Sequence, residues 1–275
     1  MNQTAQRAKK LFITNPMKME VTRFRSRFLR PTESSSVNKT LLGMVVLCYA
    51  VILGSVWVFR ADVPPLALIT LQAMLGLIAA PSAAHAVIAG EKDRRSWDLL
   101  QAAPISQAEI VVGKFMGVAG LVSSLMLAFL PMIVVTAIAY HDPNNSVTFS
   151  KLLFSELFAG TSTLAAIAFS VNLSARLKSA TSALVTSIAS LVGVLAIVPL
   201  ATIVLLDGVH SSETILDALW AWHPIYAIFR VWKPLGLPIA ALDFWYGLPL
   251  VLFYLGVTAY FLRSAESTLQ KPKVE

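Results

Sequence analysis

Six apolar segments constrain the fold of this chain more than any other feature. Each offers about the 20 apolar residues that a helix needs to cross a bilayer at a rise of 1.5 Å per residue. They cover residues 40–59, 64–89, 115–139, 152–173, 180–206 and 244–262. Charged residues make up 13% of the chain, against about 25% in soluble domains. The sequence therefore predicts an all-α integral membrane protein with six transmembrane helices in a single domain over residues 1–275.

The distribution of lysine and arginine predicts the orientation. With a cytosolic N-terminus, eighteen of these residues face the cytosol and four face outward. The positive-inside rule then places both termini in the cytosol, in a multi-pass protein of the inner or plasma membrane. Five tryptophans agree, because they map to the outer interface: Trp57, Trp220, Trp222, Trp232 and Trp245. The positive charge thus follows topology and does not indicate a nucleic acid partner.

Residues 12–30, before the first span, predict an amphipathic interfacial helix. Asn15 followed by Pro16 is a favourable helix start. An apolar stripe follows at helical spacing, with basic residues away from it: Ile13, Met17, Val21, Phe24 and Phe28. Such a helix lies in the headgroup plane and contacts membrane lipid. The alternative is an ordinary basic flank that only sets topology.

The stretch from Glu91 to Lys114 is a strongly charged island between two spans. It predicts a short charged helix over residues 91–101, a turn at Pro104 and a return to apolar sequence at Ile110. We expect an apolar ridge that enters a groove on a partner, oriented by charge pairs. The ridge consists of Trp97, Leu99 and Leu100, and the charges are those of Glu91, Asp93, Arg94, Arg95 and Asp98. The alternative is a cytosolic loop whose charges only keep it solvated.

The segment 207–243 is too short for a folded domain. It holds apolar helical pieces around residues 215–222 and 224–232. We expect two short helices that dip into the outer leaflet before the last span.

Polar side chains inside the spans are candidates for a transport pathway, because a charge at the bilayer centre costs about 2.5–3.5 kcal/mol. They are Glu156 and the hydroxyls of the fifth span, Thr181, Ser182, Thr186, Ser187 and Ser190. Glu156 is alternatively an interface carboxylate, and small hydroxyls equally serve helix packing. His85 is either a packing residue or a proton relay or ligand. Asn172 and Ser174 are expected to cap or pack the end of the fourth span.

Signatures of catalysis are missing from the sequence. It contains no Gly-x-x-x-x-Gly-Lys-Ser/Thr loop, no His-Glu-x-x-His and no Gly-x-Ser-x-Gly. We therefore expect no catalytic residues, no metal site and no cofactor in this chain.

The charged stretch resembles the type-2 ABC transporter permease family. The matching positions are Glu91, Asp93, Ser96, Asp98, Leu99, Leu100, Ala102, Pro104, Ser106, Glu109, Ile110, Gly113 and Lys114. The resemblance extends to the amphipathic N-terminal helix, the six-span layout and, more weakly, residues 223–230. It departs from the family pattern at Arg95, where glycine is usual.

This resemblance implies the permease subunit of an ATP-driven exporter, in which residues 91–104 form the coupling helix. The expected ATPase contacts are Glu91, Asp93, Arg94, Trp97, Asp98, Leu99, Leu100 and Pro104. ABC ATPase subunits would bind ATP and Mg in trans, so no enzyme activity is expected here. A second permease copy or a related permease would complete the path. The short apolar outer segment suggests an amphipathic or lipid-linked substrate. The alternative is a membrane anchor or scaffold that recruits a cytosolic partner without moving solute.

Overall fold

The computed structural model describes residues 64–140, 147–206, 220–232 and 239–270, together with Leu11, Asn15, Val46, Tyr49, Ala50 and Gly54. Within these residues the chain is helical and contains no strand. The helices are α4 (Pro65–Ala84), α5 (Ala89–Asp93), α6 (Trp97–Ala102), α7 (Gln107–Ala139), α8 (Phe149–Arg176), α9 (Ala180–Val192), the π-helix η1 (Gly193–Ile197), α10 (Val198–Leu206), α12 (Pro224–Trp232) and α13 (Ile239–Gln270).

Five segments of the described residues are long and apolar enough to cross a membrane. They are Pro65–Asp93, Gln107–Ala139, Phe149–Arg176, Ala180–Thr202 and Gly247–Gln270. They correspond to the second to sixth predicted spans, so the protein is a multi-pass helical membrane protein. Most of the first predicted span, 40–59, most of the predicted interfacial helix and all of residues 207–219 lie outside the described residues.

Helix ends differ from the predicted spans where local hydrogen bonding continues a helix beyond the apolar run. α7 begins at Gln107, eight residues before the predicted start at residue 115, because Ser106 and Glu109 form a capping box. The Glu109 backbone N–H donates to the Ser106 hydroxyl at 3.3 Å, and the Ser106 N–H donates to the Glu109 carboxylate at 2.8 Å. α4 ends at Ala84, about one turn after Pro81.

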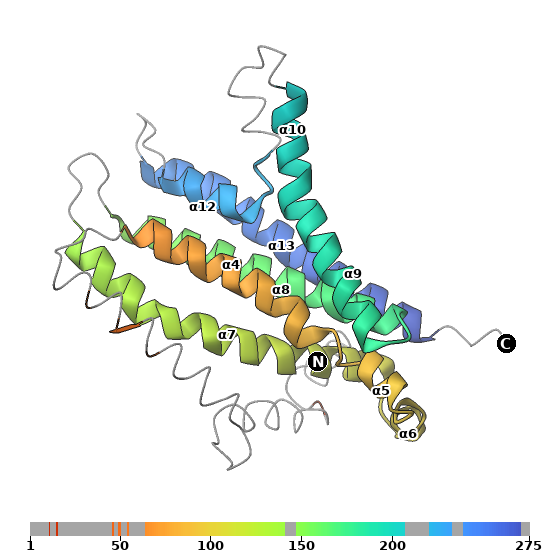
Figure 1. Cartoon of the computed structure of the whole chain (residues 1–275). Coiled ribbons are helices and arrows are strands. Elements are labelled where there is room, and N and C mark those ends of the chain that lie inside the picture. Colours follow the sequence, from red (N-terminus) through yellow and green to blue (C-terminus); the bar gives the residue numbers. More distant parts are fainter. Residues whose placement is uncertain are drawn as a thin grey trace, which may run out of the picture.

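α8 is the central helix of the bundle, with α4, α7, α12 and α13 packed around it (Figure 1). Its buried face is made largely of alanine, serine and threonine. Small residues allow close approach of helix backbones, which is how membrane helices associate. At Gly76 of α4, an added Cβ would lie 2.6 Å from the Thr163 hydroxyl of α8.

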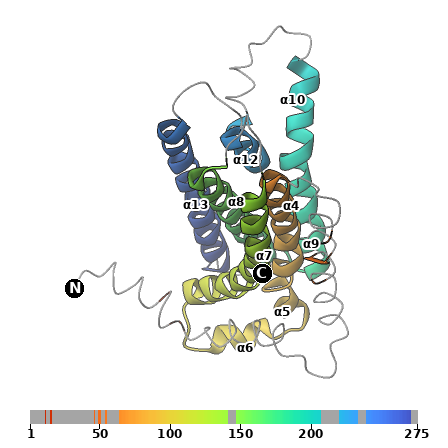
Figure 2. The same cartoon turned by 90° about the vertical axis from the view of Figure 1, so that its left-hand side faces the viewer.

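The two ends of the bundle carry different short helices. Figure 2 places α5 and α6 at one end and α12 toward the other, and these ends are called the α5 end and the α12 end below. Trp232 in α12 is buried, and its indole N–H donates to the Ser155 hydroxyl at 2.9 Å. Trp232 was predicted at the outer interface, and the structure shows that its ring packs in the core at the α12 end.

The fifth span diverges from the bundle. α9, η1 and α10 follow one another along one side, and α10 projects beyond the other helices (Figure 1). The segment Ala180–Thr202 is only 11% buried, against 56% for α8. Much of its apolar surface is thus left uncovered by the described residues.

Candidate functional site: the α5–α6 element

The charged island folds as two short helices at the α5 end. A single helix over residues 91–101 was predicted, and this prediction is wrong because Arg95 separates α5 from α6. Arg95 has a φ of 58°, in the left-handed region that favours glycine. Its N–H donates to the Lys92 carbonyl at 3.1 Å, and the Ser96 N–H donates to the Glu91 carbonyl at 3.0 Å. These two bonds form a Schellman motif, the common way to end a helix.

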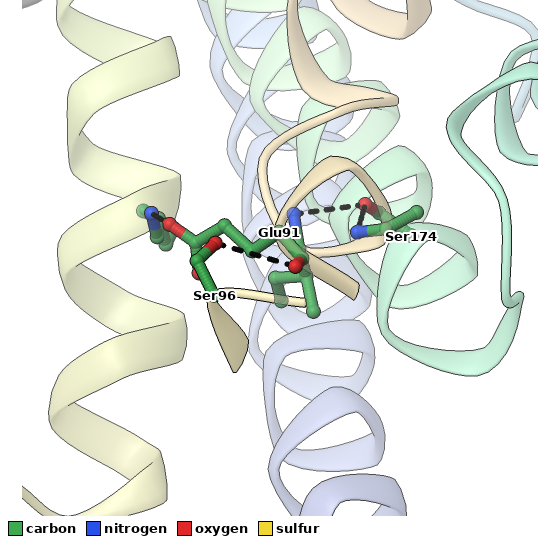
Figure 3. Close-up of polar contacts among 6 residues, drawn as sticks. Glu91, Ser96 and Ser174 are labelled. Carbon is green, nitrogen blue, oxygen red and sulfur yellow. Dashed lines mark hydrogen bonds and ion pairs between the residues drawn. The ribbon is translucent and has the colours of Figure 1, made fainter. Parts of the chain in front are cut away.

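Glu91 joins this element to α7. Its carboxylate forms an ion pair with Lys114, whose side chain is 6% exposed. The Glu91 carbonyl also accepts a bond from the Ser96 hydroxyl at 3.3 Å (Figure 3). Glu91 therefore joins α5 to α7 through its side chain and to Ser96, the residue before α6, through its backbone. Breaking a buried ion pair by removing one partner is strongly destabilising, because the other charge stays uncompensated.

Ser174, in the last turn of α8, anchors the start of α5. Its hydroxyl accepts bonds from the backbone N–H groups of Ile88 at 3.1 Å and Ala89 at 2.9 Å (Figure 3), and donates to the His85 carbonyl at 2.7 Å. The first N–H groups of a helix have no partner within the helix. Ser174 was predicted to cap or pack its own helix end, and the structure shows that it caps a helix distant in sequence.

Lys92 and Asp93 bind opposite sides of the turn between α8 and α9. The Lys92 ammonium donates to the carbonyls of Ala175 and Leu177 at the C-terminal end of α8. The Asp93 carboxylate accepts from the Ala180 N–H, the first residue of α9, at 2.8 Å. A cation at a helix C-terminus and an anion at a helix N-terminus both complement the helix dipole. The sequence analysis did not include Lys92 among the site residues. The alternation of charge at Glu91, Lys92 and Asp93 was the signal in the sequence that could have indicated it.

The exposed surface of the element is narrower than predicted. Leu99 is 77% exposed, but Trp97 is only 5% exposed and packs in the core of the α5 end. Leu100 is half-buried. The predicted ridge of three apolar side chains is therefore corrected to Leu99 flanked by exposed polar and charged residues. Those exposed neighbours are Asp93, Arg94, Arg95, Asp98 and Gln101, and Pro104 is also exposed.

Asn15 shows that the N-terminal segment reaches this end. Its side-chain amide donates to the Glu109 carbonyl in α7 at 3.0 Å and to the Leu11 carbonyl at 3.0 Å. Asn15 was predicted to start the interfacial helix. The predicted stripe residues Met17, Val21, Phe24 and Phe28 lie outside the described residues.

The predicted pathway residues lie on two helices, with Glu156 on α8 and the hydroxyls on α9. Glu156, half-buried in α8 toward the α12 end, accepts a bond from the Gln72 amide of α4 at 3.1 Å. Ser182 and Thr186 are exposed near the start of α9, and Ser190 lines an apolar cavity. About 20 residues of α8 separate Glu156 from the turn before Ser182, which is about 30 Å along the helix.

The spans and the charged element occur in a chain that matches a known protein family. The model of the family described as ABC-2 family transporter protein matches residues 6–226. This chain belongs to the ABC-2 transporter family. It is accordingly a transporter permease, a membrane transport subunit of a family whose members typically work with ATPase subunits. No curated protein matches the chain.

Proposed function

We propose that this ABC-2 family chain is the permease subunit of an ATP-driven exporter. The α5–α6 element faces the cytosol and docks ATPase subunits that bind ATP and Mg in trans. Both termini are cytosolic, and the chain pairs with a second copy or a related permease. The substrate is amphipathic or lipid-linked.

The observation that carries this proposal is Leu99, a large apolar side chain held out from a charged helix. Partners recognise such surfaces through an apolar anchor inserted in a pocket, with surrounding charges that fix orientation. Leu99 stands 77% exposed at the end of the bundle. Arg94, Arg95 and Asp98 surround it with charges of both signs.

The bonds of α5 support a coupling role. Glu91 ties the element to α7, Ser174 ties it to α8, and Asp93 ties it to α9. Motion passes between distant sites through rigid elements and hydrogen-bond networks that have contiguous contacts. A displacement of α5 by a bound ATPase would therefore pull on three spans at once.

Pairing of two permeases is supported by the fifth span. Exposed apolar residues follow it from α9 into α10, including Val185, Ile188, Val192, Ile197 and Leu200. The spans of a single chain are also few for a transport path that is formed between two moving halves. We therefore place the path between two permeases, with ATP binding and hydrolysis shifting the population between inward-open and outward-open states.

The test is Leu99→Asp in the full-length protein, purified from its native membrane with a tag. We expect a P-loop ATPase to co-purify with the wild type near a 1:1 ratio, and the variant to lose it by at least about tenfold, since a charge enters the docking pocket. Gln101→Asp is the matched control. It adds the same charge to the same helix about 200° around the axis, and we expect it to retain the ATPase.

Two outcomes would redirect the proposal. Unchanged recovery and unchanged coupled ATPase activity with Leu99→Asp would remove Leu99 from the docking surface. A partner without a nucleotide site in the wild-type sample would favour the anchor or scaffold function instead.

A further inference from the structure

An apolar cavity of about 230 Å³ lies between α8, the fifth span and α13. On α8 it is lined by Ser162, Ala165, Ala166 and Phe169, which follow one another at helical spacing on one face. The small residues among these four leave the room that the cavity occupies. The α8 wall is thus a stripe that runs along the helix.

The wall on α13 has the same form. It consists of Phe253, Tyr254, Val257 and Phe261, which span about 12 Å at 1.5 Å per residue. Two parallel stripes on neighbouring helices enclose a space that is elongated along the helices. This shape fits a linear chain better than a compact ring system.

The lining chemistry excludes water. It includes no charged side chain, and its hydroxyls are those of Ser162, Ser190 and Tyr254. The Ser162 hydroxyl donates to the Ala159 carbonyl at 3.2 Å, and the Tyr254 hydroxyl donates to the Trp222 carbonyl. A buried water needs two to four polar partners, whereas apolar cavities stay dry and accept apolar ligands. The occupant must therefore be apolar along most of its length.

The cavity has one amphipathic end. Trp222 and Tyr254 line it toward α12, and the Trp220 indole beside them donates to the Thr202 hydroxyl at 3.0 Å. Tryptophan and tyrosine gather where headgroups meet hydrocarbon. The opposite end, at Phe169 and Phe261, is apolar. A ligand with a polar head at the α12 end and an apolar tail toward the α5 end matches this gradient.

The wall formed by the fifth span is interrupted by the π-helix η1. Pro199 has no N–H, so it cannot donate to the Leu195 carbonyl four residues earlier. That carbonyl lies in the π-helix η1 and pairs with the His223 ring at 2.9 Å. A second apolar cavity of about 260 Å³, between α4 and the fifth span, shares Leu77, Leu191 and Leu195 with the first. Each of the two volumes is close to the lower limit for ligand pockets, about 300 Å³.

We infer that this cavity binds one acyl chain of a phospholipid from the surrounding bilayer, with its headgroup at the α12 end. Three of the walls belong to helices long and apolar enough to cross the membrane, and α13, which forms one of them, exposes Leu252 and Phe253. Acyl chains are therefore present where the cavity opens. The bound chain fills space between the fifth span and the bundle, and so supports the least buried span. This inference requires membrane insertion but not transport.

The experiment uses the full-length protein in detergent with a phosphatidylcholine that carries a photoactivatable diazirine on one acyl chain. Native mass spectrometry counts retained phospholipid after washing, and peptide mapping locates the adducts after illumination. We expect one retained phospholipid per chain, with adducts on peptides that contain Phe169, Leu195 or Val257.

Two variants fill the cavity from opposite walls, Ala165→Phe on α8 and Val257→Trp on α13. Each is expected to lower retention and cavity adducts at least fivefold. Two variants on different helices are used because one of them could misfold. Size-exclusion profiles identify which variants are folded, and only a folded variant tests the site. Ala259→Phe is the matched control, because Ala259 is exposed on α13 and outside the lining. It should retain lipid as the wild type does.

Three results would overturn the inference. The first is a washed wild-type protein without phospholipid. The second is equal retention in a folded filling variant and in Ala259→Phe. The third is a lipid-free dimer whose cross-links show that a second copy occupies the cavity.

Discussion

The Ser174 hydroxyl accepts a hydrogen bond from the Ala89 backbone N–H at 2.9 Å, which joins the end of α8 to the first residue of α5. The two residues are 85 positions apart in the chain. The same hydroxyl serves Ile88 and His85, so one buried side chain satisfies three backbone groups in the turn between α4 and α5. The position of the α5–α6 element therefore depends on α8.

Ser174→Ala should lower the free energy of unfolding by about 1–3 kcal/mol, because buried N–H groups lose their partner. Ser170→Ala is the matched control in the same helix. The Ser170 hydroxyl is buried but bonds to the Ala166 carbonyl of its own helix at 2.9 Å, so we expect a change below about 1 kcal/mol. Thermal unfolding in detergent compares the two, and equal losses would argue against the anchoring role.

Arg95→Gly should stabilise the protein by about 1 kcal/mol, because a residue with a Cβ is strained at positive φ. Arg94→Gly should instead destabilise by about 0.5–1 kcal/mol, because Arg94 has a φ of −84° that needs no glycine. Both changes remove one exposed cation, so charge loss cancels in the comparison. Denaturation of the two variants side by side measures the difference. A lower stability of Arg95→Gly than of Arg94→Gly would contradict the prediction.

Gly76→Ala should destabilise the packing of α4 on α8 by about 1–3 kcal/mol, because the new methyl group overpacks the contact. Its Cβ would lie 2.6 Å from the Thr163 hydroxyl, which is held by a 2.7 Å bond to the Ala159 carbonyl. Gly120→Ala is the control, since its Cβ would meet no heavy atom within 4 Å. That change should be neutral or stabilising by up to about 1 kcal/mol. Equal shifts in the melting temperatures of Gly76→Ala and Gly120→Ala would refute the close contact.

His223 makes the stability of the α12 end depend on pH. Its Nδ1 accepts from the Tyr226 N–H at 3.2 Å while Nε2 contacts the Leu195 carbonyl at 2.9 Å, which requires the neutral ring. Burial lowers the pKa of His223, and the bond to Leu195 opposes this in part. The unfolded chain therefore gains a proton near pH 6.5 while the folded protein does not, and stability falls as pH drops below about 6.5.

The measurement is unfolding of wild type and His223→Gln between about pH 7.5 and pH 5, the range around the unfolded pKa of histidine. Glutamine keeps a donor but does not titrate, so the acid-induced loss should shrink in the variant. Parallel pH curves for the two proteins would exclude His223 as the group responsible.

The limits of prediction are clearest at particular helix ends. Residues 180–206 were predicted as one span, and α9, η1 and α10 together cover that range. α13, predicted over 244–262, instead runs from Ile239 to Gln270, because a helix does not have to end where hydropathy falls. The split at Arg95 was also missed. The departure from a family glycine at that position was its only signal in the sequence.

Membrane class, the placement of five spans and the charged island between the second and third spans were determined by sequence alone, because bilayer insertion sums hydropathy over about 20 neighbouring residues. The tertiary structure alone decided that Trp97 is buried and Leu99 exposed. It also decided that Ser174, Lys92 and Asp93 join α5 to the end of α8 and the start of α9. These contacts join residues more than 80 positions apart. They exist only when packing of small residues along α8 brings the helix ends together.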